Sequence, residues 1–334
     1  MEQLELVAVQ LDEALNLIKV GRIPQLRLAF LLIDNAAELM MYRTTKEETE
    51  YQFLYVSMHH QAKLMQSRVA DDAEIRARIQ DLENKIIPEE KLKEIDREFR
   101  AKVNFLVARG RLDPSLGTIL KKLHRYRNDM YHQARIRKAL IETAALVYFD
   151  VACALLAAWA PPRMSSTSEP YTDLERFGIG RHDLFKDGLC NQVAQRLRDE
   201  AGVDATGVRS ALISHLNERL DELDEMISFV IEEGVPPEFS SLDDAIRLIQ
   251  ADLMGPELPP LEDLRQQRFP VQSRTLRLWR IQVTQLAKVT DRYEMYSRFA
   301  AIEDRFETFE ERVRTVAGLV DSRIQFEIDQ ARGK

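Results

Sequence analysis

The chain has few of the residues that interrupt helices or cross-link small folds. Its 334 residues include only 12 glycines, 12 prolines and 2 cysteines. The two cysteines, Cys153 and Cys190, are too few for a disulfide framework, which indicates a reducing compartment. Little glycine and proline, no clear strand-like alternation, and abundant Leu, Ala, Glu, Gln and Arg predict an all-α protein.

A long uninterrupted apolar run is also missing. The most apolar segment, residues 139–160, is interrupted by Glu142 and Asp150, so we interpret it as a core helix rather than a membrane span. The first ten residues, MEQLELVAVQ, lack the basic start and apolar stretch of a signal peptide. We therefore expect a cytoplasmic protein with no membrane partner.

Charge is distributed unevenly along the chain. The formal net charge is −8, from 47 basic and 55 acidic residues. Residues 100–138 nevertheless hold eleven Lys or Arg and only two acids, Asp113 and Asp129. Such a local excess of positive charge is expected around an anion such as a phosphodiester. Later, residues 216–263 hold fourteen acids and two bases, whereas residues 264–298 hold eight bases and two acids.

Proline and serine divide the chain into two predicted domains. The stretch PPRMSSTSEP, residues 161–170, is the clearest linker, and we place the domain boundary in it. Residues 1–160 should form one helical bundle and residues 171–334 a second helical module. Apolar residues alternate at three- and four-residue spacing near the end and predict a long amphipathic terminal helix; they are Phe299, Ile302, Phe306, Phe309, Val313, Val316 and Val320. This helix either packs inside its own domain or forms a seam between two chains.

The motif RNDMYH, residues 127–132, lies in the centre of the basic stretch. Asp113 followed by Pro114 is typical of a helix cap with proline at the first helical position, so we expect one helix from there to about residue 160. On an ideal helix, a polar stripe about 80° wide would contain Lys121, Arg125, Asn128, His132 and Arg135. Arg127 would lie about 140° from His132, so one straight helix does not bring both to one face.

The pattern Arg127-Asn128-x-x-x-His132, in a helical and basic context, resembles the signature of the HEPN family (higher eukaryotes and prokaryotes nucleotide-binding domain). The resemblance covers about residues 1–160. It implies a homodimer in which the motif helices of two chains face each other, so that arginine and histidine from both line one cleft. Arg125 also stands at a permitted distance before His132. Family toxins that are paired with nucleotidyltransferases often carry Tyr two residues after the histidine, but Ala134 stands here, so modification by such a partner is not expected.

The resemblance also implies a metal-independent endoribonuclease that needs no cofactor. The 2′-hydroxyl of RNA would attack the neighbouring phosphodiester while His132 transfers a proton. Arg127 would donate hydrogen bonds to the phosphate oxygens, and Asn128 would orient His132 or the phosphate. The residues expected to bind RNA around these three are Lys121, Lys122, Arg125, Tyr131 and Arg135.

Other polar and aromatic residues are interpreted as structural. His59 and His60 are adjacent and lack the four-residue helical spacing that would aim both at one metal, so no metal site is predicted. Asp34 and Glu38 fall on the second predicted helix, where surface placement is favoured over an approach to the cleft. Tyr126 is expected to pack in the bundle rather than to stack on a base.

Three functions are consistent with these features. We favour a toxin or anti-phage defence effector that cleaves RNA and is held in check by its C-terminal module or by a partner, because a free ribonuclease would harm its own cell. The acidic part of that module would contact a protein partner or inhibitor, or cover the cleft. The alternative is a non-catalytic helical scaffold that binds a protein, RNA or nucleotide ligand through the basic surface around residues 100–138. The third is an inhibitor whose acidic module imitates nucleic acid.

Overall fold

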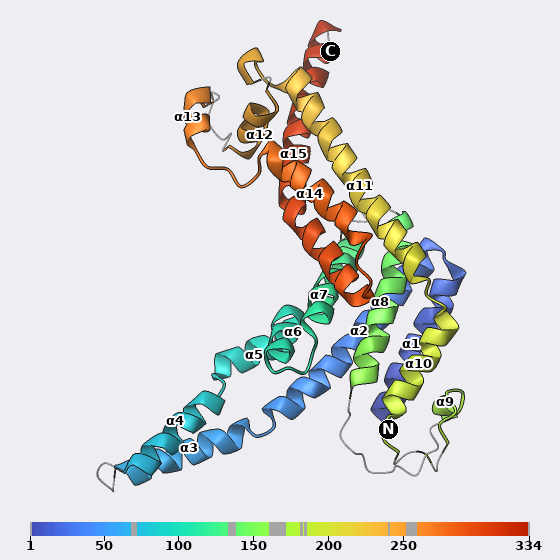
Figure 1. Cartoon of the computed structure of the whole chain (residues 1–334), viewed down its shortest axis with the longest axis vertical. Coiled ribbons are helices and arrows are strands. Elements are labelled where there is room, and N and C mark those ends of the chain that lie inside the picture. Colours follow the sequence, from blue (N-terminus) through green and yellow to red (C-terminus); the bar gives the residue numbers. More distant parts are fainter. Residues whose placement is uncertain are drawn as a thin grey trace. The chain divides into compact units, whose positions relative to one another are not determined.

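The computed structural model confirms the predicted all-α fold, since its described residues form helices and no strand (Figure 1). The described residues are 2–67, 72–132, 138–159, 172–180, 183, 186–239, 241–251 and 259–332, with residues 131, 132, 138 and 139 described through their backbone alone. The chain divides into two compact units, Met1–Val203 and Asp204–Lys334.

The core of the first unit is formed by four helices that lie side by side (Figure 1). They are α1 (Glu2–Val20), α2 (Ile23–Thr49), α8 (Lys138–Ala158) and α10 (Leu189–Ala201). The turn between α1 and α2 passes through Gly21, whose φ of 69° lies in the left-handed region that favours glycine. This turn lets α1 and α2 pack their apolar sides against each other along most of their length.

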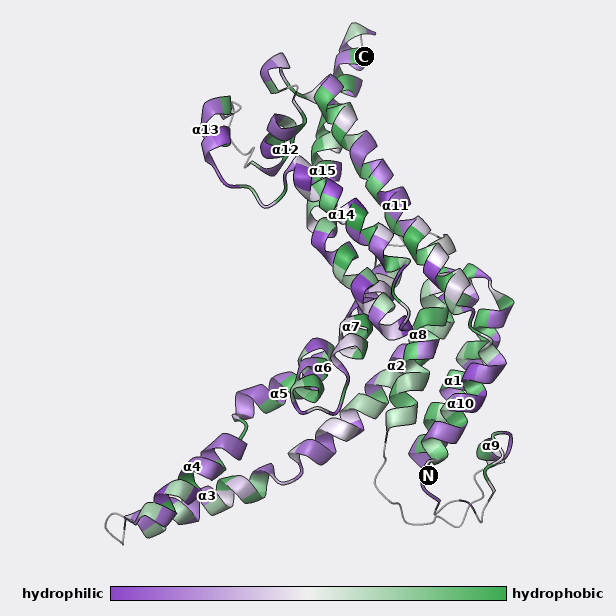
Figure 2. Ribbon diagram, in the orientation of Figure 1, coloured by the Kyte–Doolittle hydropathy of each residue, from purple (hydrophilic) through white to green (hydrophobic). Residues whose placement is uncertain are grey.

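Helix α8 is the most apolar of the four (Figure 2). Leu140–Ala158 has the length and composition of a membrane span, but 72% of its apolar window is buried within the protein. Asp150 in its middle is fully buried and pairs with Arg198 of α10, whose Nε donates to Asp150 Oδ1 at 3.2 Å. Arg198 Nη2 also donates to the Asp150 carbonyl oxygen at 3.3 Å. Burial of this carboxylate therefore depends on α10.

The division into units differs from the predicted domain boundary. Residues 161–170 lie outside the described residues, and the first unit continues through α9 (Thr172–Glu175) and α10 to Val203. The reason is packing that the linker composition does not encode. Helix α9 contacts α1, and α10 contacts both α8 and α1.

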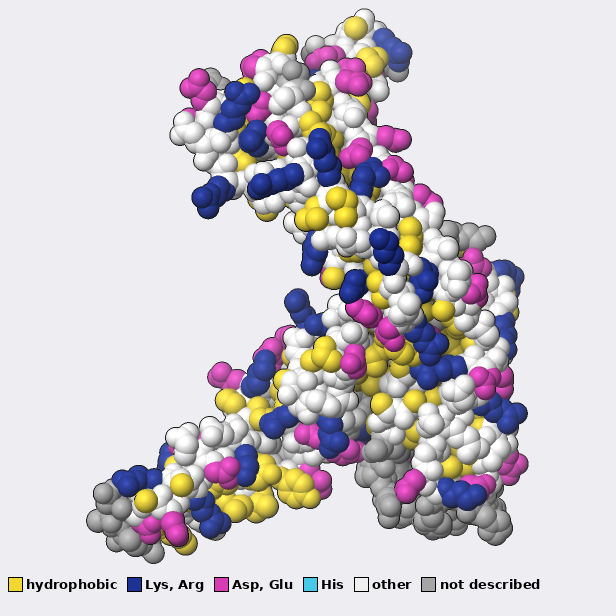
Figure 3. Space-filling view, in the orientation of Figure 1, with side chains coloured by type: hydrophobic (Ala, Val, Ile, Leu, Met, Phe, Trp, Pro, Cys, Tyr) yellow, Lys and Arg dark blue, Asp and Glu magenta, His cyan; other side chains and the backbone are white. Residues whose placement is uncertain are grey.

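The first unit also contains α3 (Gln52–Gln66), α4 (Ala73–Lys85), α5 (Glu89–Arg97) and α6 (Phe99–Ala108). Helices α3 and α4 pack as a hairpin around Ala62, Ile79 and Leu82. The Gln52 side chain closes its base, donating to the Lys85 carbonyl oxygen at 3.1 Å and accepting from the Ile87 amide at 2.8 Å. The hairpin exposes large apolar side chains, which gather near the start of α3 (Figure 3); on α3 and just before it they are Tyr51, Phe53, Leu54, Val56, Leu64 and Met65.

The predicted helix from residue 114 to 160 is instead two helices. Helix α7 spans Pro114–His132, and α8 begins at Lys138 and contacts α7. The predicted cap is present, because Asp113 Oδ1 accepts from the amides of Ser115 at 2.8 Å and Leu116 at 3.3 Å. The motif at residues 127–132 therefore lies at the carboxyl end of α7, not near the start of a long helix.

The second unit is built on three long helices, α11 (Ala205–Phe229), α14 (Ser273–Leu286) and α15 (Arg292–Ala331), which lie side by side (Figure 1). Helix α15 is the predicted long terminal helix, and all seven residues of its apolar repeat are buried within this chain. The repeat therefore packs inside its own unit. A π-helical turn, Val230–Gly234, ends α11.

Buried charges fix how α11 and α15 meet. Glu303 and Glu310 of α15 are 1% and 3% exposed, and both pair with Arg219 of α11. The Arg219 guanidinium carbon lies 4.8 Å from the centre of the Phe306 ring, a cation–π contact. His215 Nε2 lies 3.3 Å from Glu303 Oε1. Sliding α11 along α15 would leave two carboxylates buried without these partners.

A smaller helical cluster completes the second unit: the 3-10 turn Pro237–Phe239, α12 (Leu242–Gln250) and α13 (Leu261–Gln266). Phe239, Leu248, Ala251 and Leu264 form its apolar core. Ser241 caps α12, since Ser241 Oγ accepts from the Asp244 amide at 3.2 Å. The Asp244 carboxylate itself is 3% exposed and pairs with Arg265 of α13 at 2.7 Å.

Arg198→Met should destabilise the first unit by about 3 kcal/mol, because it removes the charged partner of the buried Asp150. Each unit holds one tryptophan, so urea unfolding followed by fluorescence in a Trp279→Phe background reports the first unit through Trp159. Arg196→Met on the same helix is the control, because its 3.5 Å pair with Glu200 is exposed and should contribute about 1 kcal/mol or less. Equal losses in the two variants would contradict the role given to Arg198.

Asp244→Asn should destabilise the second unit in a pH-dependent manner. The hydrogen bond from Arg265 lowers the Asp244 pKa from 3.8 to about 2, with Ser241 and Arg247 contributing. A lowered pKa stabilises the fold above the unfolded value of 3.8 and loses that effect as pH falls toward 2. The difference in unfolding free energy between the wild type and the Asp244→Asn variant should therefore be about 2 kcal/mol near neutral pH and shrink below about pH 4.

Urea unfolding followed through Trp279 in a Trp159→Phe background measures this difference at each pH. The control is Asp263→Asn, which changes an exposed acid on α13. A difference between the Asp244→Asn variant and its parent that stays constant from pH 7 to pH 3 would show that the charge of Asp244 does not matter.

Candidate functional site

The candidate site is centred on Asp34, a buried acid of α2 that is 2% exposed. Its Oδ1 accepts a hydrogen bond from the Tyr148 hydroxyl of α8 at 2.5 Å and lies 2.8 Å from His124 Nδ1 of α7. Its Oδ2 lies 3.5 Å from Arg127 Nε, also of α7. The expected surface position of Asp34 is therefore wrong, and one carboxylate joins three helices at the motif.

Helical spacing explains why two residues of α7 reach the same acid. His124 and Arg127 are three positions apart, so their side chains project from neighbouring points on one face of the helix. A buried carboxylate is costly unless charged or hydrogen-bonding groups surround it. Asp34 meets this condition through a cation, an imidazole and a hydroxyl, and these contacts set the rotation of α7 against α2.

His124 is held on two sides. Its ring stacks on Phe99 of α6, with ring centres 3.9 Å apart and planes 6° from parallel. Because Nδ1 faces the Asp34 carboxylate, the neutral ring carries its proton on Nδ1 and its lone pair on Nε2. The side chain is 23% exposed. This pairing of carboxylate and imidazole is an arrangement that can orient a general base.

Arg127 is partly open to solvent, with its side chain 35% exposed. Its Nη1 donates to Asn128 Oδ1 at 2.9 Å, so the Asn128 amide, which was expected to orient His132 or a phosphate, contacts the guanidinium. The guanidinium thus contacts Asp34 on one side through an ion pair and Asn128 on another through a hydrogen bond. A guanidinium held in this way can bind an oxyanion with little loss of conformational entropy.

The other predicted site residues differ in how deeply they are buried. Lys121 is half-buried, and its Nζ donates to Asn104 Oδ1 at 3.1 Å. Arg125 is also half-buried. Lys122 is only 4% exposed, with Nζ 5.3 Å from the centre of the Tyr126 ring, so it is packed inside the bundle and does not belong to an RNA-binding surface. Arg135 and the side chains of Tyr131 and His132 lie outside the described residues.

Several neighbours also have structural roles. Tyr126 is 6% exposed, as expected for a packed residue. Glu38 of α2 accepts from Lys102 Nζ at 3.1 Å, and Lys102 is 1% exposed. His59 lies 3.1 Å from Glu83 of α4, within the hairpin. Among the described residues, no group of three or more His, Cys, Asp and Glu side chains is arranged to hold a metal ion.

Two residues of the site were missed by sequence reasoning. His124 carries a usable signal, because it stands three positions before Arg127 and four before Asn128, the spacings at which helical side chains are neighbours. Asp34 carries a weaker one, a single acid in the apolar run LLIDNAA. An acid at such a position is buried only with partners from elsewhere in the chain, and the sequence alone does not identify them.

Tyr148 should resist ionisation while the protein is folded. Burial raises the pKa of its phenol well above 10, and the negative charge of Asp34 raises it further. The difference in absorbance near 295 nm between wild type and Tyr148→Phe should show no tyrosinate at pH 10 in native buffer. In concentrated urea the same difference should titrate near pH 10. Tyrosinate formation by Tyr148 in the folded protein at pH 10 would contradict its placement against Asp34.

The whole chain was compared with known proteins. The sequence matches no protein-family model, no curated protein and no solved structure. The resemblance of residues 1–160 to the HEPN signature therefore stays a prediction, and the geometry around Asp34 must support any function by itself.

Proposed function

We propose that this protein is a metal-independent endoribonuclease whose site lies at the carboxyl end of α7. The observation that carries the proposal is the Arg127 guanidinium, which is anchored by the buried Asp34, contacts Asn128 and keeps 35% of its side chain exposed. It lies in a stretch with eleven basic and two acidic residues, where a polyanion would be attracted.

The chemistry requires few protein groups because RNA carries its own nucleophile. The 2′-hydroxyl attacks phosphorus, a base accepts its proton, and the 5′ oxygen leaves with a proton from an acid. Arg127 stabilises the negative charge that develops on the phosphate oxygens. The products are a 2′,3′-cyclic phosphate and a 5′-hydroxyl. No step needs a metal ion or a cofactor.

Two imidazoles are candidates for proton transfer. His132 is the histidine of the motif, and His124 is the one that Asp34 orients. They are eight positions apart, which is about 12 Å along the axis of a helix, so one scissile bond contacts only one of them from the same chain. We assign the role to His132 and give His124 the structural one, since Phe99 and Asp34 hold its ring on two sides.

The proposal includes a homodimer through α7. On an ideal helix, positions 127 and 132 are about 140° apart around the axis, so a second copy of the helix is needed to bring the two residue types to one phosphate. The biological role we propose is that of a cytoplasmic toxin or antiviral defence effector. Its activity would be restrained by the second unit or by a protein partner that binds there.

The non-catalytic scaffold is the second candidate, and one observation favours it. The pair between Arg127 and Asp34 would stabilise the bundle whether or not RNA is bound, as would the contact of Asp34 with His124. In that case the same basic surface would bind RNA, a nucleotide or a protein without cleavage.

The decisive experiment is RNA cleavage by the purified chain in excess EDTA, with detection of 2′,3′-cyclic phosphate ends. His132→Ala should lower the cleavage rate by at least about a hundredfold, because general acid–base catalysis contributes roughly 10²–10⁴. Arg127→Lys should also be strongly impaired, since it keeps the charge but loses the planar pair of donors. His124→Asn should retain most activity if His132 transfers the proton.

Arg100→Ala is the matched control, because it removes an exposed arginine of the same basic stretch. Circular dichroism verifies that each variant folds. Cleavage that persists in both His132→Ala and Arg127→Lys rules out the proposed site. RNA binding without any cleaved product, unchanged in His132→Ala, supports the scaffold instead.

A further inference from the structure

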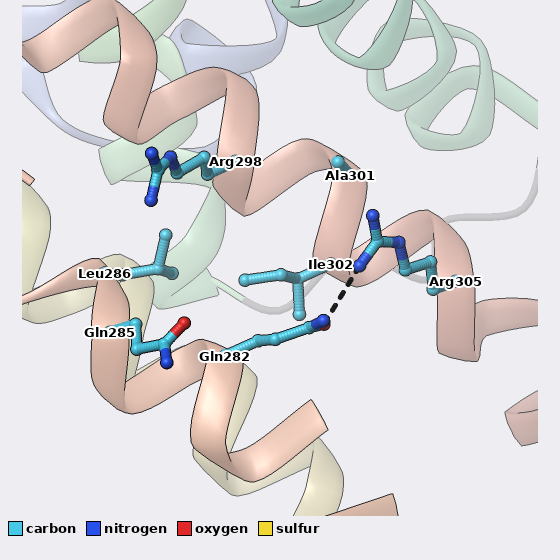
Figure 4. Close-up of a pocket in the computed structure, with 7 residues that line it drawn as sticks. All are labelled: Gln282, Gln285, Leu286, Arg298, Ala301, Ile302 and Arg305. Atoms are coloured by element: carbon cyan, nitrogen blue, oxygen red, sulfur yellow. Dashed lines mark hydrogen bonds between the residues drawn. The ribbon is translucent and has the colours of Figure 1, made fainter. Parts of the chain in front are cut away.

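A small pocket lies between α14 and α15, within the second unit (Figure 4). Its volume is about 190 Å³. The residues around it come from the two helices alone and are Gln282, Gln285, Leu286, Arg298, Ala301, Ile302 and Arg305. No sequence motif predicts a site here, although the chain between residues 264 and 298 is markedly basic.

The pocket follows from side-chain size at a helix contact. On α15, Arg298 and Arg305 are seven positions apart, which places both on one face two turns apart. Ala301 lies between them, and its short side chain leaves open the space that a larger residue would fill (Figure 4). Leu286 of α14 and Ile302 of α15, which are 1% and 5% exposed, lie beneath the opening.

The lining has a single sign of charge. Two guanidiniums and two carboxamides surround the space, and no carboxylate is among the lining residues. Arg305 Nη1 donates to Gln282 Oε1 at 3.1 Å, and Arg298 Nη2 pairs with Glu294 Oε1 at 2.5 Å. A guanidinium has five N–H donors, so both arginines keep donors beyond these contacts with the described residues. Glu294 itself is outside the lining and half exposed.

The chemistry and the size together select the ligand. Arginine forks match the oxygens of phosphate, and carboxamides add further donors. Pockets for drug-sized ligands measure about 300–1,000 Å³, so this one suits only a small group. We propose that the second unit binds a phosphate dianion here, either inorganic phosphate or the phosphate of a small monoester.

This site is independent of the proposed ribonuclease function. It lies in the other unit, uses none of the residues around Asp34 and involves no covalent step. Its success or failure in an experiment therefore leaves the cleavage assay unaffected, and the reverse also holds.

The test is isothermal titration of the full-length protein with inorganic phosphate and, separately, with ethyl phosphate and dimethyl phosphate. Inorganic phosphate and ethyl phosphate should both bind, because each presents a dianionic phosphate to the two arginines. Dimethyl phosphate, a singly charged diester like the RNA backbone, should bind at least about tenfold more weakly than ethyl phosphate. The same titrations are repeated with variants of the pocket.

Arg298→Gln and Arg305→Gln should each weaken phosphate binding about tenfold, because each removes one charged donor group. Ala301→Leu should abolish binding by filling the pocket while leaving both charges in place. Arg277→Ala is the control and should bind as wild type, because Arg277 is an exposed arginine of α14 outside the pocket. Thermal unfolding verifies the fold of each variant.

The inference is overturned if millimolar phosphate and ethyl phosphate give no binding heat with the wild-type chain. It is also overturned if the two glutamine variants bind as wild type, or if dimethyl phosphate binds best. A folded Ala301→Leu variant that retains binding would place the anion elsewhere on the surface.

Discussion

The cost of burying a carboxylate among helices is the constraint on which this structure depends. Asp34, Asp150 and Glu303 are each 2% exposed or less, and each lies on a helix that is otherwise apolar where it packs. A buried carboxylate is tolerated when cations or hydrogen-bond donors surround it, and removing one of them is more costly than never having had the charge. Every one of these acids finds its partner on another helix, so each specifies a particular pairing of helices.

The candidate site is a consequence of the same constraint. Asp34 satisfies its charge with Arg127 and His124, and in doing so it turns one face of α7 toward α2. The guanidinium that compensates the acid is then fixed in place before any ligand arrives. A fixed guanidinium is useful for binding a developing oxyanion, since little reorganisation remains when charge appears. Stability and the proposed catalysis thus depend on the same contact. Arg127→Lys distinguishes the two roles better than Arg127→Ala, because Lys keeps the positive charge beside Asp34 but loses the planar pair of donors.

Local signals in the sequence were sufficient for the fold class and for several helix boundaries. The Asp113 cap needs only two or three neighbouring residues, so it could be predicted from the chain and is found. The repeat from Phe299 to Val320 likewise depends only on spacing, and α15 buries it. The division of residues 114–158 into α7 and α8 could not be predicted from a helix-breaking residue, because the segment contains no proline after Pro114 and no glycine after Gly117.

What could not be predicted were contacts between distant parts of the chain. The composition of residues 161–170 indicates a linker, but Arg198 must meet Asp150 for α10 to join the first unit, and the sequence gives no distance between them. The burial of Asp34 is of the same kind, since Tyr148 lies more than a hundred residues away from it in the chain.

The basic stretches can be found from the sequence, but the exposure of each cation in them depends on packing. The basic stretch around the motif is uniform in the sequence, yet within it Lys122 is buried against Tyr126 while Arg127 stays partly exposed. No function was predicted for the later basic stretch, residues 264–298. Its last residue, Arg298, nevertheless lines a pocket together with Arg305, and the shape of that pocket depends on the small Ala301. Counting charges finds the regions where an anion is attracted. Only packing decides which cations can meet it, because Lys122 is buried against the Tyr126 ring, whereas Arg127 keeps part of its side chain exposed while it pairs with Asp34.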